Sequence, residues 1–148
     1  MKCILKSTNV NPLRQGWCKL LDYYRWTWFT TLTFRDFPKT YTAINRAKRF
    51  LTAIQRKEKR EIGYYIAMEY TQLGCPHFHL LMGNLEGVRY SKWFTWWFSR
   101  YGGARFKVYD PEKGATHYLT KYVVKSTSWY DLKGLEYMNQ LTFDKKTE

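Results

Sequence analysis

Two helix patterns, each enclosed by strand-like runs, constrain the fold of this chain more than any other feature. Apolar residues recur at three-to-four spacing in residues 42–60, and a second helix pattern, rich in aromatic residues, covers residues 91–101. Runs dense in β-branched and aromatic residues stand at 26–34, 62–70, 77–83 and 104–109. Since these patterns indicate helices and strands, the order is β-α-β-β-α-β. This order predicts an α+β, ferredoxin-like (RRM-like) antiparallel sheet with helices on one face and the other face open.

Two segments lie outside this pattern. Residues 1–22 have no regular period, so we expect an arm with at most one short strand. Residues 116–125 (THYLTKYVVK) have a helix pattern, so a third helix is expected after the last strand. Because the chain contains no linker or internal repeat, residues 1–148 are expected to form a single domain.

The chain is strongly basic and rich in aromatic residues. It has 25 Lys and Arg against 12 Asp and Glu, a net charge of +13, and 20% of its residues are aromatic. Cations can follow phosphates while rings stack on unpaired bases, so we expect a single-stranded nucleic acid as partner. A basic surface that serves solubility or an anionic membrane is the alternative, but no basic amphipathic helix indicates a membrane. Arg14, Lys19 and Arg25 are candidate phosphate contacts.

Cysteine usage and the N-terminus indicate a cytoplasmic protein. Cys3, Cys18 and Cys75 are odd in number and widely spaced, which does not fit a disulfide framework and suits a reducing compartment. The sequence has no secretory signal pattern and no run of about 18 apolar residues that would cross a membrane.

Residues 76–82 (PHFHLLM) place two histidines two residues apart in a strand-like run. Side chains alternate along a strand, so His77 and His79 share one face. Glu69 joins them on that face if a hairpin pairs residue 69 with residue 77 or 79. Two imidazoles and one carboxylate suit a divalent ion such as Mn²⁺ or Mg²⁺, and three protein ligands leave positions for water and a phosphate oxygen.

Two alternatives to a catalytic metal site stay open at this point. The histidines could be half-buried strand residues beside a solvated glutamate. Cys75, two residues before His77, could instead contribute to a Cys/His zinc cluster, although no second thiolate lies nearby in the sequence.

Residues 118–125 (YLTKYVVK) carry the second chemical pattern. Helical spacing places Tyr118, Tyr122 and Lys125 on one side, with Lys121 one step around the axis. A phenol has a pKa of about 10, so it is a poor nucleophile until a cation or a metal-bound base assists it. A lysine three residues later can supply that positive field or hold a DNA phosphate. The alternative is a helix whose tyrosines and valines pack on the sheet while its lysines face solvent.

In chain order, the strand FTTLTF (residues 29–34), the acidic strand followed by PHFHLL, and YLTKYVVK resemble the three motifs of the HUH endonucleases. The resemblance runs from about residue 29 to residue 125 and is closest to rolling-circle replication initiators (Rep proteins) of small plasmids and single-stranded DNA phages. H-x-H alone is weakly specific, whereas this combination is quite specific. By analogy with the family, the first strand, where Thr31 and Thr33 share a face, supports the site.

The resemblance implies a metal-dependent endonuclease that nicks and rejoins single-stranded DNA at an origin or hairpin through a 5′-phosphotyrosine. His77 and His79 match the metal-binding histidines of the family, and Glu69 stands where many members have a third, acidic ligand. The expected cofactor is Mn²⁺ or Mg²⁺. The expected partners are origin DNA and a host polymerase and helicase, and the protein is expected to be a monomer.

The nucleophile motif of the family is satisfied twice, by Tyr118 with Lys121 and by Tyr122 with Lys125. We expect Tyr122 to be the principal nucleophile and Tyr118 to be either a second nucleophile or a supporting residue. A tyrosine-HUH transposase is an alternative, although the doubled Y-x-x-K and the acidic strand favour an initiator. The second alternative is a non-catalytic single-strand or RNA-binding module on the same scaffold, which would bind without metal and form no covalent adduct.

Overall fold

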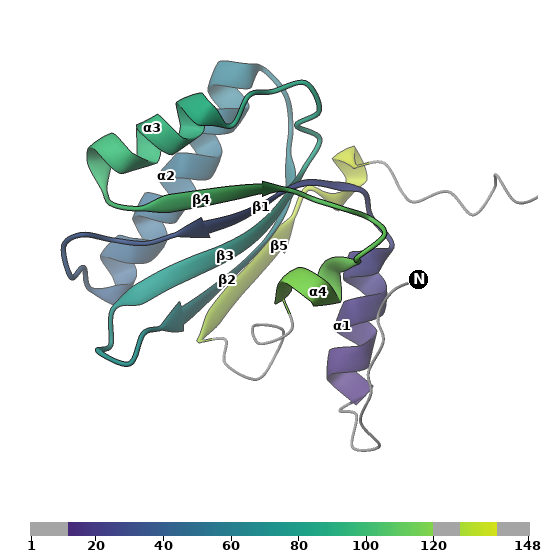
Figure 1. Ribbon diagram of the computed structural model, residues 1–148, viewed down its shortest axis with the longest axis horizontal. Coiled ribbons are helices and arrows are strands. Elements are labelled where there is room, and N and C mark those ends of the chain that lie inside the picture. Colours follow the sequence, from purple (N-terminus) through teal and green to yellow (C-terminus); the bar gives the residue numbers. More distant parts are fainter. Residues whose placement is uncertain (1–11, 120–127, 139–148) are drawn as a thin grey trace, which may run out of the picture.

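The computed structural model describes residues 12–119 and 128–138, which form one antiparallel sheet with helices on both of its faces (Figure 1). The strand order is β4-β1-β3-β2-β5. The strands are β1 (Trp26–Leu32), β2 (Gly63–Tyr70), β3 (Pro76–Gly83), β4 (Ala104–Val108) and β5 (Trp129–Lys133). The helices are α1 (Pro12–Asp22), α2 (Thr40–Glu58), α3 (Ser91–Arg100), α4 (Ala115–Leu119) and a 3₁₀ helix, η1 (Leu135–Tyr137).

The α+β, ferredoxin-like arrangement predicted from the sequence is confirmed. The elements β1, α2, β2, β3, α3 and β4 follow each other in the expected order, and their strands make the sheet order β4-β1-β3-β2. β1 pairs with both β3 and β4, so this aromatic and threonine-rich strand lies inside the sheet. β5 extends the sheet beyond β2, which makes β2 an internal strand as well.

The main hydrophobic core lies between the sheet and the helices α2 and α3. Alternate strand residues point into it, among them Leu32, Ile66, Phe78 and Leu80, and they meet Phe50 of α2. Both Trp93 and Trp97 of α3 are fully buried in this core, and Trp96 packs at its border. The three tryptophans therefore hold α3 against α2 and the sheet.

The structure corrects the expectation of an irregular N-terminal arm, because residues from Pro12 onward form α1. Proline is tolerated in the first turn of a helix, where its missing N–H has no partner to lose, and one glycine costs only about 1 kcal/mol. Gly16 and Pro12 therefore do not prevent the helix. Cys18 and Leu21 are buried on one side of it, whereas Lys19 is exposed on the other.

α1 and α4 also correct the expectation that helices cover a single face of the sheet. They contact each other and lie on the face opposite α2 and α3 (Figure 1). A second hydrophobic cluster joins Leu21 of α1 and Ala115 of α4 to the sheet residues Phe29, Tyr65 and Leu81. Apolar side chains on this second face of the sheet thus provide a surface for both helices, and the face is not open throughout.

The C-terminal part of the chain is described in pieces. The helix expected at residues 116–125 is present as α4 up to Leu119, and its remainder lies outside the described residues. β5, which follows at Trp129–Lys133, was not expected. Within the described parts of the chain, no helix is long and apolar enough to cross a membrane.

The position of Leu80 in the central strand predicts a large difference between two chemically identical mutations. Leu80 is fully buried, so we expect Leu80→Ala to lower the free energy of unfolding by about 2–5 kcal/mol because it leaves a cavity. Leu73, in the turn between β2 and β3, is 87% exposed, and Leu73→Ala should change stability by less than about 0.5 kcal/mol. Urea denaturation measures both values, and equal values would contradict the assigned strand faces.

Candidate metal centre

The register of the β2–β3 hairpin brings Glu69, His77 and His79 to one face of the sheet. Glu69 stands directly opposite His77, and Ala67 stands opposite His79. Directly opposed residues of antiparallel strands point the same way, and so do residues two apart on a strand. The condition set by the sequence analysis is therefore met. This is the same face that α1 and α4 cover in part.

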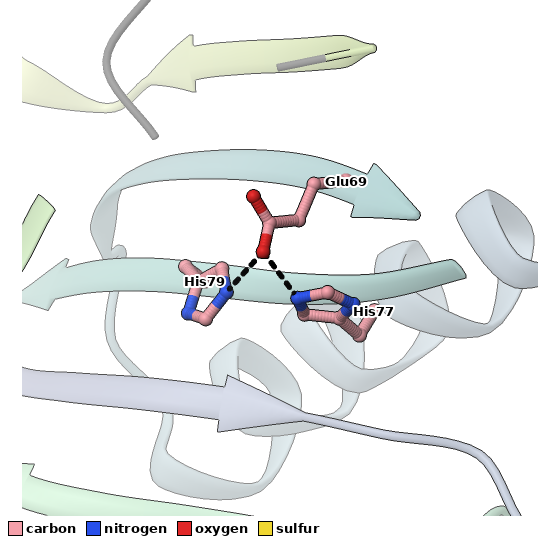
Figure 2. A group of neighbouring side chains, drawn as sticks. All are labelled: Glu69, His77 and His79. Atoms are coloured by element: carbon pink, nitrogen blue, oxygen red, sulfur yellow. Dashed lines mark hydrogen bonds and ion pairs between the residues drawn. The ribbon is translucent and has the colours of Figure 1, made fainter. Parts of the chain in front are cut away.

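The side chains of the three residues converge, as Figure 2 shows. His77 Nε2 lies 2.6 Å from Glu69 Oε1, and His79 Nε2 lies 3.6 Å from the same oxygen. One ligand atom from each residue lies within 4.8 Å of the other two. In the described part of the chain, this is the group of acidic, histidine and cysteine side chains that could hold a metal ion.

The donor set fits a divalent ion. Ligand atoms about 2.1 Å from a shared ion are separated from each other by roughly 3–4 Å, which the 3.6 Å distance between His79 and Glu69 already satisfies. The 2.6 Å distance between His77 and Glu69 is that of a hydrogen bond, so these two side chains would separate slightly around an ion. Two nitrogens and one carboxylate oxygen suit a borderline ion such as Mn²⁺ and leave coordination positions for a substrate.

The surroundings of His79 keep its imidazole neutral. The residue is 6% exposed, and burial, followed by the neighbouring His77, lowers its pKa to about 3. The neutral ring is the form that binds a metal ion, because a protonated nitrogen has no lone pair to offer. The site therefore has at least one imidazole ready for coordination at neutral pH.

Thr31 and Phe29 of β1 hold the His79 ring from the neighbouring strand. Thr31 pairs with His79 in the sheet, and its Oγ1 lies 3.4 Å from His79 Nδ1. The Phe29 ring lies parallel to the imidazole, with centroids 6.1 Å apart. A partner at Nδ1 orients the ring so that Nε2 points toward the ligand position. The sequence placed Thr31 in a supporting strand, but its contact with His79 depends on the strand register.

Cys75 does not contribute to the group of candidate ligands. Its Sγ lies near the backbone carbonyl oxygens of Asp36 and Pro76, and burial, followed by Asp36, raises the pKa of the thiol. A thiol of raised pKa is a poor source of the thiolate that zinc needs. The alternative of a Cys/His zinc cluster therefore has no support in the structure.

Tyr118 is packed into the second hydrophobic cluster. Its ring contacts those of Phe29 and Tyr109, with centroids 5.2 Å away in both cases. Its hydroxyl oxygen accepts a hydrogen bond from the backbone N–H of Asp110 at 3.0 Å. At the start of α4, Asp22 Oδ1 accepts a hydrogen bond from the Ala115 N–H at 2.6 Å. α4 is thus held to both β1 and α1.

The remaining residues named from the sequence have different standing. Tyr122, Lys121 and Lys125 lie outside the described residues. Arg14 belongs to α1, Lys19 is an exposed residue of that helix, and Arg25 is exposed just before β1. Their contacts with nucleic acid stay predictions.

Comparison with protein families identifies the class to which the chain belongs. Residues 27–127 match the replication-associated protein ORF2 family. The chain therefore belongs to this family of replication-associated proteins, which is consistent with a rolling-circle replication initiator. Comparisons with curated proteins and with solved structures gave no significant match.

The geometry predicts that Glu69 contributes to metal binding. Glu69→Gln preserves the shape of the side chain but removes its charge, so we expect Mn²⁺ affinity to fall by at least about tenfold. Glu86→Gln is the matched control, because Glu86 is exposed in the segment after β3. Isothermal titration calorimetry with Mn²⁺ measures both variants, and the same affinity for Glu69→Gln and wild type would exclude this carboxylate as a ligand.

Proposed function

We propose that this protein is a replication initiator endonuclease that nicks and rejoins single-stranded origin DNA in rolling-circle replication. The observation that carries this proposal is the convergence of Glu69, His77 and His79 on the sheet face where α4 begins the tyrosine segment. Membership of a replication-associated family supports a role in DNA replication. The net charge of +13 supports a polyanionic partner.

The residues of the chain divide the chemistry among them. A divalent ion held by the three ligands would polarise the scissile phosphate and offset the charge that develops on it. The hydroxyl oxygen of Tyr122 attacks the phosphorus, the bond from phosphorus to the 3′-oxygen breaks, and that oxygen takes up a proton. The products are a 5′-phosphotyrosine and a free 3′-hydroxyl that can prime a polymerase. Attack by that or another hydroxyl reverses the step and rejoins a strand without ATP.

The two tyrosines have different roles in this proposal. The Tyr118 hydroxyl already accepts a hydrogen bond from Asp110, and its ring is packed against Phe29, so Tyr118 supports the start of the helix. Tyr122, one helical turn later, is the principal nucleophile. Lys125 follows Tyr122 by three residues, as Lys121 follows Tyr118, and these lysines supply positive charge near the phosphate.

The rest of the proposal concerns the setting of the reaction. The substrate is single-stranded or extruded DNA at the origin of a small plasmid or a phage. A host polymerase and helicase extend and unwind the nicked strand. The protein acts as a monomer in the cytoplasm.

Tyrosine mutants test the nucleophile directly. The protein is incubated with Mn²⁺ and a random-sequence pool of single-stranded oligonucleotides labelled at the 3′ end, since the phosphotyrosine retains the 3′ fragment. Wild type should give a labelled band that survives SDS, whereas Tyr122→Phe and His79→Ala should not. Tyr118→Phe should retain the adduct and lose about 1 kcal/mol of stability with its hydrogen bond.

Two outcomes would contradict the proposal. Undiminished adduct in the Tyr118→Phe/Tyr122→Phe double mutant would exclude both tyrosines as nucleophiles. Binding of the pool by wild type without any adduct, with or without Mn²⁺, would favour a non-catalytic single-strand-binding module.

A further inference from the structure

One row of side chains crosses all five strands on the face that carries the candidate metal centre. Arg105 pairs with Thr31, and Thr31 pairs with His79. His79 pairs with Ala67, and Ala67 pairs with Tyr130. Because directly opposed residues point to the same face, the row has Arg105 at the β4 edge, His79 at its centre and Tyr130 at the β5 edge.

The β4 end of the row is positively charged. Arg105 and Lys107 are both exposed and, being two apart, share the face of the metal centre. Phe106 between them packs on the opposite side, against the main core. Neither cation forms an ion pair with any residue in the parts of the chain described. Their charge is therefore available to an anionic partner.

The β5 end of the row is aromatic. Tyr130 is 53% exposed and is supported from one side by Trp17 of α1, with ring centroids 5.3 Å apart and planes at 82°. Tyr65 of β2 lies next to it, with a centroid distance of 6.5 Å. A ring that is fixed by other rings and half exposed is suited to stack on a nucleic acid base.

The spacing of the strands sets the scale of this surface. Neighbouring strands lie about 4.8 Å apart, so Arg105 and Tyr130 each stand two strands, or about 10 Å, from His79. Nucleotides on either side of the scissile phosphate, not that phosphate itself, would reach the two ends of the row.

We propose that single-stranded DNA crosses the sheet along this row. Arg105 binds a backbone phosphate on one side of the scissile phosphate, and Tyr130 stacks on a base on the other side. This inference rests on the proposed function, because the candidate metal centre defines the middle of the path. The sequence analysis missed both residues, since only the register across five strands aligns them.

Binding measured in EDTA separates this inference from cleavage. Fluorescence anisotropy is recorded with a fluorescein-labelled, random-sequence pool of single-stranded oligonucleotides over a range of salt concentrations. Arg105→Gln should weaken binding and reduce the slope of log affinity against log salt by about 0.7, as expected for one lost phosphate contact on a single strand. Tyr130→Leu should weaken binding about tenfold without changing that slope, and Tyr130→Phe should bind like wild type.

Two control variants match these mutations on the other side of the sheet. Arg49→Gln removes an exposed cation of α2, and Phe98→Ala removes an aromatic ring of α3 that is also 53% exposed. Both should bind like wild type. Thermal melting of each variant verifies that it is folded.

The outcomes distinguish the inference from the proposed function. Wild type that fails to bind the pool would overturn both. Wild type that binds and forms the tyrosine adduct, while Arg105→Gln and Tyr130→Leu bind like the controls, would overturn the row alone. Weaker binding by Arg105→Gln with an unchanged salt slope would overturn the phosphate contact.

Discussion

The pairing of Glu69 with His77 across the β2–β3 hairpin is the constraint on which the site depends. Side chains alternate between the faces of a sheet, so a slip of one residue would send the glutamate and the histidines to opposite faces. The turn between the strands fixes this register: Gly74 adopts a positive φ of 83°, and its N–H donates to the Thr71 carbonyl. The candidate metal centre is thus a consequence of a tight hairpin between two internal strands.

The two faces of the sheet have separate tasks. One face buries aliphatic and aromatic side chains under α2 and α3, and this packing makes the strands a rigid base. The other face combines a smaller hydrophobic cluster with the candidate ligands, and Phe29 belongs to both, since its ring contacts those of His79 and Tyr118. Packing on this second face therefore ties the start of α4 to the metal centre.

Features set by local sequence were predictable. Period-two alternation placed His77 and His79 on one face, and the pattern of residues 42–60 identified α2. α1 was missed because Pro12 and Gly16 resemble breakers, although a first-turn proline is compatible with a helix. Features set by pairing between distant segments could not be predicted. β5 is short and contains Asp131 and Lys133, and its place beside β2 depends on contacts remote in sequence.

The central claim is that Glu69, His77 and His79 hold one divalent ion on the sheet. Anomalous diffraction from crystals of the protein grown with Mn²⁺ tests it most directly. The account predicts a manganese peak about 2.0–2.3 Å from the Nε2 atoms of His77 and His79 and from a carboxylate oxygen of Glu69. A manganese peak at other residues, with these three side chains still hydrogen-bonded to each other, would contradict it.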